Sequence, residues 1–197
     1  MQKYNYIDED ILKEITNVLD NDGLIIFPTD TVYGIACNSN SDVAIRKLYH
    51  AKNRSFDNPI GVLTDSIDKI KLIAKDIGNK ELELMNKYFP GNLTIIVNKK
   101  ENVSNLLTAN NPTIGVRIPD NEVALAILKS YPYPLATTSV NLSGLKEGTE
   151  VSDFIDDFQD KVDIIIDGGK TTEIPSTIVR VEDNKINILR QGSLEIK

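Results

Sequence analysis

The residues best suited to chemistry begin directly after an apolar segment near the N-terminus. Residues 24–27 are apolar, and the next seven, Pro-Thr-Asp-Thr-Val-Tyr-Gly at 28–34, carry four oxygen-bearing side chains. Proline cannot donate to a sheet ladder, so Pro28 predicts the end or the edge of a strand. Open α/β sheets bind ligands at the carboxyl ends of their strands, which makes this segment a candidate wall of a site. A threonine or aspartate turn that only caps the strand explains the same residues, and it is favoured if the segment is taken alone.

Two cations, Lys52 and Arg54, form the second cluster. We expect residues 51–59 to be extended, because Pro59 disfavours a helical conformation at Asn58. In an extended chain, residues i and i+2 face the same way, so both cations could converge on one anion. The compact charge of a lysine ammonium beside the planar, forked donors of an arginine guanidinium suits a polyphosphate. The alternative is a solvated surface pair, which is commoner.

The third cluster, Thr-Thr-Ser-Val-Asn at 137–141, follows the apolar pair 135–136. Ser139 and Asn141 share one face of the expected strand, where they offer a hydroxyl and an amide. Both groups suit phosphate oxygens, a ribose or a metal-bound phosphate, and neither is a strong base. A second capped strand end is about equally consistent with this cluster alone.

Two arginines stand where a charge needs a partner. Arg117 lies within the apolar segment 114–118, and Arg190 ends the last strand-like segment beside Gly192. An unpaired buried charge is very costly, so each predicts either a bound carboxylate or phosphate, or an internal Asp or Glu. The sequence contains no GxxxxGK[ST] loop and no GxGxxG, and its lone histidine, His50, supports no Ser/His/Asp arrangement.

Helical and strand patterns alternate along the chain, which predicts a single α/β domain over residues 1–197 with a mixed sheet. Helices are expected at 11–19, 41–49, 66–74, 80–89, 121–129 and 153–159. Strands are expected at 24–27, 60–63, 93–97, 114–118, 135–138, 162–166, 177–181 and 185–189. Residues 98–112 are expected to form a short helix and a loop, and residues 141–152 a mobile loop hinged at Gly144 and Gly148.

Composition narrows the class of protein. The 197 residues are 41% hydrophobic and 26% charged, as in ordinary soluble globular proteins. The chain lacks an apolar run of roughly eighteen residues, and its polar, acidic N-terminal residues do not resemble a signal peptide. The single cysteine, Cys37, follows an apolar pair and is expected to be a buried, inert thiol. These features predict a cytoplasmic protein with no membrane partner. The net charge of −7 argues against a broad nucleic-acid footprint, yet it allows a small cationic pocket.

Taken in order, several motifs resemble those of the YrdC family, the threonylcarbamoyl-AMP synthases. The matching residues are Pro-Thr-Asp-Thr-Val-Tyr-Gly at 28–34, Lys52-x-Arg54, Pro-Gly-x-Leu-Thr at 90–94, Gly-Val-Arg-Ile-Pro at 115–119, Thr-Ser-Val-Asn-x-Ser-Gly at 138–144, Ser-Thr-Ile-Val at 176–179 and Leu-Arg-x-Gly at 189–192. They span nearly the whole chain, and their common order is more specific than any single motif. The length resembles the short, single-domain form of the family.

The resemblance implies a YrdC-like open α/β fold, in which a twisted mixed β-sheet with flanking helices surrounds a deep concave cleft. It also implies that L-threonine, bicarbonate and ATP are converted to threonylcarbamoyl-AMP and pyrophosphate, with Mg²⁺ bound through the ATP phosphates. The product would pass to a separate tRNA threonylcarbamoyl transferase complex, which modifies the adenosine next to the anticodon.

The resemblance also implies roles for individual residues. Threonine would be held by Thr31, Tyr33, Arg117, Thr137 and Ser176. ATP would be contacted by Arg54, Asn58, Thr113, Ser139 and Arg190. Lys52, Arg54, Ser139 and Asn141 would form a catalytic quartet around the phosphates. Arg117 as a bidentate clamp on the threonine carboxylate would explain a charge within a strand.

Two other hypotheses compete with the synthase. One is a binding module of the same fold that carries tRNA or double-stranded RNA, which the acidic net charge makes weaker because each phosphate contact needs a cation. The other is a paralogue that acts on a different acyl acceptor, or that transfers carbamoyl groups in metalloenzyme maturation. The known form of that last role resides in a large protein with cysteine-rich zinc modules, an architecture that one cysteine excludes.

Overall fold

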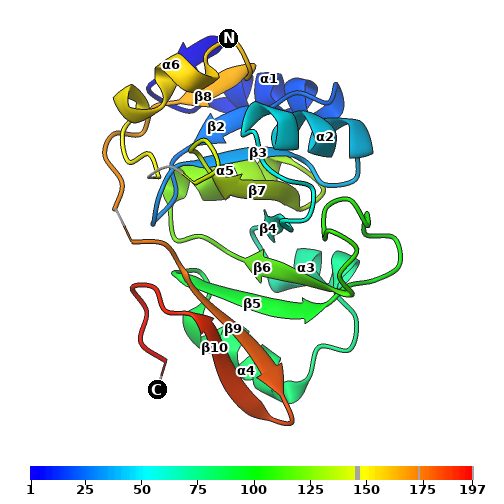
Figure 1. The fold of residues 1–197 in the computed structure, drawn as a ribbon. Coiled ribbons are helices and arrows are strands. Elements are labelled where there is room, and N and C mark those ends of the chain that lie inside the picture. The colour runs from blue at the N-terminus through cyan, green and yellow to red at the C-terminus, as the bar shows by residue number, and fades with distance from the viewer. Residues whose placement is uncertain (145–146, 173, 197) are drawn as a thin grey trace.

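A ten-stranded mixed sheet runs through the computed structural model of the protein, with the strand order β1-β8-β2-β3-β7-β4-β6-β5-β9-β10 (Figure 1). The structure describes residues 1–144, 147–172 and 174–196. The strands are β1 (Gln2–Tyr4), β2 (Ile25–Phe27), β3 (Gly34–Asn38), β4 (Gly61–Leu63), β5 (Leu93–Asn98), β6 (Thr113–Arg117), β7 (Leu135–Ser139), β8 (Ile164–Ile166), β9 (Thr177–Glu182) and β10 (Lys185–Arg190). The helices are α1 (Glu9–Asp20), α2 (Asp42–Ala51), α3 (Ile67–Ile73), α4 (Asn79–Tyr88), α5 (Glu122–Ser130), the short 3₁₀ helix η1 (Val151–Asp153) and α6 (Ile155–Phe158).

The sheet contains both parallel and antiparallel neighbours, which confirms the predicted mixed α/β fold. β8 is parallel to both β1 and β2, and the pairs β4–β6 and β5–β9 are also parallel. The remaining pairs are antiparallel, and β9 and β10 form the hairpin expected around residues 182–184. In Figure 1 the twisted sheet extends from β1 at the top to β10 at the bottom, and the two termini lie at opposite ends of the molecule.

Helices cover both faces of the central strands. In β2, Ile25 and Phe27 belong to a hydrophobic cluster with α1 and α5. Ile26 and the preceding Leu24 belong to the cluster on the other side, with α2. A strand that is buried on both faces needs a continuous apolar run, which explains why residues 24–27 do not alternate. Cys37 is also fully buried, and burial raises the pKa of its thiol well above the usual range, so its predicted burial is confirmed.

The chain after α2 is folded differently from the predicted extended segment. Lys52 ends the helix in a helical conformation, and Asn53 has a positive φ of 51°. The backbone N–H of Arg54 donates to the carbonyl of Tyr49 at 2.9 Å, which is the closing hydrogen bond of a Schellman motif. The expectation that residues 51–59 are extended is therefore wrong, because asparagine tolerates the left-handed conformation that closes a helix and turns the chain sharply.

Three smaller expectations also need revision. β1 was not expected, because Gln-Lys-Tyr carries no strand pattern and its backbone is ordered by pairing with β8. Residues 100–112 form turns and loops without the expected helix, and the expected helix at 153–159 is divided between η1 and α6. Of the loop expected over 141–152, residues 145–146 lie outside the described residues, and the mobility of that loop stays a prediction. Among the described residues, no helix is both long enough and apolar enough to cross a membrane.

Candidate active site

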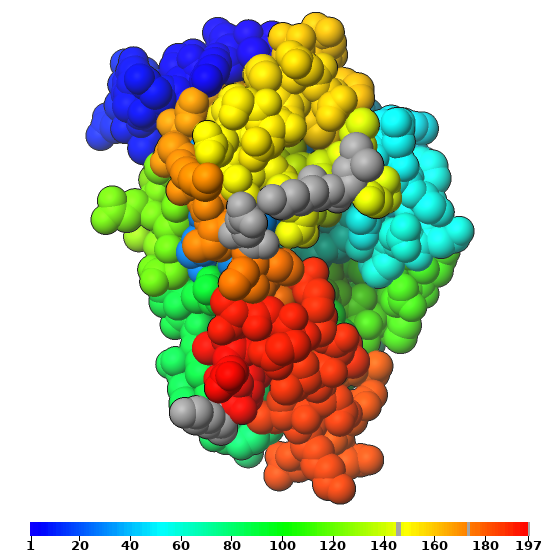
Figure 2. All heavy atoms as spheres, turned by 60° about the vertical axis from the view of Figure 1, so that its left-hand side comes forward, coloured from blue at the N-terminus to red at the C-terminus, as the bar shows by residue number. Residues whose placement is uncertain are grey.

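A cleft of about 690 Å³ opens where the β2–β3 turn and the end of α2 meet strands β4 to β7 and the segment that enters β9. Figure 2 shows the surface hollowed between the residues that follow β7 (yellow) and the C-terminal hairpin (orange to red). The volume is that of a typical small-molecule site. Ten of the predicted site residues line the cleft: Thr31, Tyr33, Lys52, Arg54, Arg117, Thr137, Ser139, Asn141, Ser176 and Arg190.

The turn between β2 and β3 is both a strand cap and a wall of the cleft. The Thr29 hydroxyl donates to the carbonyl of Val32 at 2.6 Å and accepts from the backbone N–H of Thr31 at 3.1 Å. Because that donation uses the only hydroxyl hydrogen of Thr29, the 3.1 Å contact between the two threonine hydroxyls must be donated by Thr31. Thr31 Oγ1 then keeps its lone pairs, one of which accepts from Arg117. Residues 28–34 therefore both cap the strand and form a wall of the cleft, as the two explanations from the sequence proposed.

Strand register brings the separate clusters together. Gly34 pairs with Ser139 across β3 and β7, and Thr137 pairs with Gly61 across β7 and β4. A Cβ atom at Gly34 would lie 2.9 Å from the Thr137 methyl group, so this position must stay bare for the two strands to pack. The carboxyl end of β7 thus lies against the amino end of β3, where the first cluster ends.

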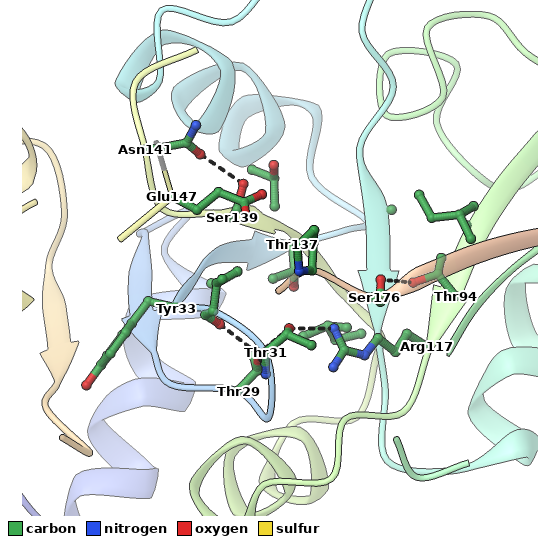
Figure 3. Close-up of a pocket in the computed structure, with 18 of the residues that line it drawn as sticks. Thr29, Thr31, Tyr33, Thr94, Arg117, Thr137, Ser139, Asn141, Glu147 and Ser176 are labelled. Atoms are coloured by element: carbon green, nitrogen blue, oxygen red, sulfur yellow. Dashed lines mark hydrogen bonds between the residues drawn. The ribbon is translucent and has the colours of Figure 1, made fainter. Parts of the chain in front are cut away.

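Arg117 has an internal partner. Its Nη2 donates to Asp30 Oδ1 at 2.5 Å and its Nε to the carbonyl of Gly91 at 2.9 Å. Its Nη1 donates to Thr31 Oγ1 at 2.9 Å (Figure 3). Burial lowers the pKa of the guanidinium and the Asp30 carboxylate opposes that shift. Nη2 also contacts Asn92 Oδ1 at 3.4 Å, so among the described partners one Nη1 N–H is left for a ligand. A bidentate clamp on a substrate carboxylate would need Asp30 to release Nη2.

Tyr33 lines the cleft through its backbone, and Figure 3 shows its ring pointing away from Thr31 and Arg117. The phenol donates to the carbonyl of Gly169 at 2.7 Å and accepts from the backbone N–H of Gly168 at 3.1 Å. Burial raises its pKa to about 12. This geometry does not support the expected contact between the Tyr33 side chain and threonine. The phenol instead anchors the turn that starts the crossing from β8 to β9.

Lys52 is buried at the opposite end of the cleft. Its ammonium contacts the carbonyl of Ser139, Asn141 Oδ1 at 3.0 Å and Thr138 Oγ1 at 3.5 Å, and the side chain is 1% exposed. Burial, assisted by the charge of Arg54, lowers the pKa of Lys52 to about 7. The Schellman turn, rather than an extended chain, brings the two cations into the cleft.

The remaining predicted nucleotide contacts divide into two groups. Arg54 donates to the carbonyls of Asn58 and Pro59, and Arg190 donates to the carbonyl of Ser176. These hydrogen bonds to the backbone hold both guanidinium groups at the cleft. Burial lowers the pKa of both guanidinium groups. Asn58 is exposed and Thr113 pairs with Asn98 at the start of β6, and neither lines the cleft. Their predicted ATP contacts have no support in this geometry.

Among the lining residues outside the predicted set, Thr94 and Glu147 carry side chains that could take part in binding. Thr94 on β5 shares a hydroxyl–hydroxyl hydrogen bond of 2.8 Å with Ser176, and Glu147 lies beside Ser139 and Asn141 (Figure 3). Thr94 belongs to the motif at residues 90–94 and could have been proposed from it. The sequence around Glu147 carries no comparable signal.

The described part of the chain contains no group of three His, Cys, Asp or Glu side chains that could hold a metal ion. Glu147 is the sole carboxylate among the described residues that line the cleft. A Mg²⁺ ion commonly combines one or two carboxylates with substrate phosphates and water. This donor set therefore fits an ion that arrives with a nucleotide better than a resident one.

Comparison of the sequence with known proteins assigns the chain to a family. The Sua5/YciO/YrdC family model, which is described as telomere recombination, matches residues 17–192. The chain belongs to this family. A threonylcarbamoyl-AMP synthase of Pyrococcus abyssi is 33% identical over 175 residues, which are 88% of this chain and 52% of that protein. A protein of Methanocaldococcus jannaschii that provisionally bears the same name is 35% identical over 190 residues, which are 95% of this chain and 88% of that protein.

Within the Sua5/YciO/YrdC family, a solved structure extends the match to three dimensions. The crystal structure of P. abyssi Sua5 complexed with L-threonine superposes with a TM-score of 0.93 at 31% identity. The superposition covers 98% of this chain and 57% of the Sua5 chain. The present chain thus spans about half the length of the Pyrococcus protein and shares its fold over nearly all of its own length.

Proposed function

We propose that this protein is a threonylcarbamoyl-AMP synthase that acts on L-threonine, bicarbonate and ATP. The observation that carries the proposal is the division of one cleft into two ends. Arg117 and Thr31 lie at one end, and Lys52 and Arg54 supply cations at the other. Arg190, which is bonded to Ser176, adds a third cation whose charge acts on Arg117 and is itself affected by Glu147. An amino acid and a triphosphate are the pair of ligands that this division fits.

The amino-acid end offers a donor for a carboxylate and an acceptor for an amine. The remaining Nη1 N–H of Arg117 suits the carboxylate, while the Thr31 hydroxyl oxygen can accept a hydrogen bond from the amine. The hydroxyl pair of Thr94 and Ser176 lies on the same side of the cleft, where it can bond a substrate hydroxyl. A site that satisfies a substrate hydroxyl rejects analogues without one, because its own polar groups are then left unpaired.

The phosphate end supplies charge without a strong base. The threonine amine and bicarbonate give a carbamate and water, and a carbamate oxygen then attacks the α-phosphorus of ATP. The new bond is carbamate oxygen to phosphorus, and the bond to the β-phosphate oxygen breaks, which releases pyrophosphate. Two anions must approach each other in this step, so cations that neutralise charge and walls that align the reactants supply much of the rate.

Named residues have distinct parts in this step. Lys52 and Arg54 would neutralise the phosphates, and Arg190 would contact the nucleotide from the C-terminal hairpin. Ser139 and Asn141 would orient phosphate oxygens with a hydroxyl and an amide. Mg²⁺ would enter on the ATP phosphates and add positive charge to the same end.

The proposal is tested by reactant omission. Purified protein given threonine, bicarbonate, ATP and Mg²⁺ should release pyrophosphate, and the release should stop when either threonine or bicarbonate is left out. Arg54→Ala should lower the rate by orders of magnitude, while Lys47→Ala, an exposed lysine on α2, should leave it unchanged. Pyrophosphate release that ignores bicarbonate would contradict the carbamate chemistry.

The product would be a reactive mixed anhydride, so a transferase complex acting on tRNA is the proposed recipient. Direct RNA binding by this chain remains the alternative, and the net charge of −7 weighs against it. A titration of tRNA at two salt concentrations decides: binding that is absent or independent of salt excludes an electrostatic RNA site.

A further inference from the structure

Glu147 places one negative charge in a cleft otherwise dominated by cations. It is the sole carboxylate among the described lining residues and is partly buried there. Figure 3 shows its side chain next to Ser139 and Asn141, which is the end of the cleft that holds Lys52. The position is therefore where the phosphates of a nucleotide would have to lie.

The nearby cations are bonded to neutral oxygens. The contacts of Lys52 are a backbone carbonyl, an amide oxygen and a hydroxyl, and Arg54 and Arg190 bond to backbone carbonyls and the Ser176 hydroxyl. Within the described residues, none of the three forms an ion pair. The carboxylate of Glu147 raises the pKa of both Lys52 and Arg190, which opposes the effect of burial on each. Its negative charge therefore acts on both of these cations.

The backbone beside Glu147 is held, which limits how its carboxylate can leave. The N–H of Gly148 donates to the carbonyl of Val140 at 3.0 Å, and its carbonyl accepts from the N–H of Tyr33 at 3.3 Å. A Cβ atom at Gly148 would lie 2.4 Å from a ring carbon of Phe154, so the chain is closely packed there. Rotation of the Glu147 side chain is then the least disruptive way to admit a phosphate.

We propose that Glu147 is a resident counter-anion of the phosphate end, which competes with bound phosphates for Lys52 and Arg190. The carboxylate balances the cations while the cleft is empty and lowers the affinity for every polyanion that replaces it. Pyrophosphate, the leaving product, is thereby released more readily than from a purely cationic cleft. The inference rests on the proposed function only in taking this end of the cleft as the phosphate site.

The test is calorimetric titration of inorganic pyrophosphate into the protein, in EDTA and at low salt. Glu147→Gln and Glu147→Ala should each bind pyrophosphate about three- to tenfold more tightly than the unsubstituted protein, because one like charge has been removed. The gain should shrink in about 0.5 M salt, where the Debye length is only a few ångströms. Glu150→Gln is the matched control, since Glu150 lies outside the cleft, paired with Lys170 at 3.1 Å. Unchanged melting temperatures establish that the variants are folded.

Equal affinity in the Glu147 variants and the control would overturn the proposal, and so would pyrophosphate binding too weak to measure in all of them. A second titration with Mg²⁺ present separates the other role open to a carboxylate. If Glu147→Gln weakens Mg²⁺–pyrophosphate binding, the side chain is a metal ligand and not a competitor. A protein that synthesises no adenylate but still gains affinity in Glu147→Gln contradicts the proposed function and keeps this inference.

Discussion

Replacement of Lys52 by methionine should change how the stability of the protein depends on pH. The ammonium is 1% exposed and bonded to neutral oxygens, and burial lowers its pKa from 10.5 to about 7. Between these two values the unfolded chain binds more protons than the folded one, so the unsubstituted protein should gain stability as the pH rises from about 7 towards 10.5. Methionine is similar in length and has no proton to exchange, so the variant lacks this gain.

The size of the effect follows from the shift. One proton of difference changes the free energy of unfolding by about 1.4 kcal/mol per pH unit. The unfolding free energy of the variant minus that of the unsubstituted protein should therefore fall by about 2 kcal/mol from pH 7 to pH 9. The variant also loses the contacts of the ammonium with Ser139 and Asn141. The part of that loss that does not depend on protonation shifts the difference without changing its slope, and the part that does is already contained in the pKa of Lys52.

Urea denaturation of both proteins at pH 7, 8 and 9 measures this difference, and subtraction removes the titration of all groups that they share. Lys47→Met, at an exposed position of α2, serves as the control and should show no slope. A difference between Lys52→Met and the unsubstituted protein that stays constant with pH would contradict this expectation, because it would mean that burial does not lower the pKa of the Lys52 ammonium.

Three further outcomes are expected. At pH 8, pyrophosphate binding should take up roughly half a proton or more relative to Lys52→Met, because the anion raises the pKa of the Lys52 ammonium; calorimetry in buffers of different ionisation enthalpy measures it. Arg117→Gln should lower the unfolding free energy by about 3 kcal/mol and threonine affinity at least about tenfold, since Asp30 is left buried and unpaired. The double variant with Asp30→Asn should recover stability but not affinity, and recovery of both would remove Arg117 from substrate binding. Tyr33→Phe should cost about 1 to 2 kcal/mol through lost bonds to the turn at 168–169, with threonine affinity nearly kept; a selective loss of affinity would return the phenol to the substrate.

The parts of the fold that the sequence could predict are those governed by local pattern and burial. The continuous apolar run at 24–27 requires burial on both faces, and Ser41 and Asn121 cap α2 and α5 where the caps were expected. β1 could not be predicted, because its three residues carry no strand pattern and are ordered by β8.

The site shows the same distinction. The polar residues at the carboxyl ends of β2 and β7 were identified from that position, where the sheet presents side chains to a ligand. The convergence of Lys52 and Arg54 was expected for the wrong reason, because the left-handed Asn53 was not recognised as the end of α2. The Tyr33 ring could not be oriented from sequence, since its partners lie more than a hundred residues away in the chain.

Mass spectrometry of the product formed from ¹³C-bicarbonate shows whether the protein builds bicarbonate carbon into an adenylate. Given threonine, ATP and Mg²⁺, the protein should make an adenylate whose mass rises by one unit with labelled bicarbonate, and Arg54→Ala should make almost none. An adenylate of unchanged mass, or none while ATP and threonine both bind, would contradict the assignment of this cleft to threonylcarbamoyl-AMP synthesis.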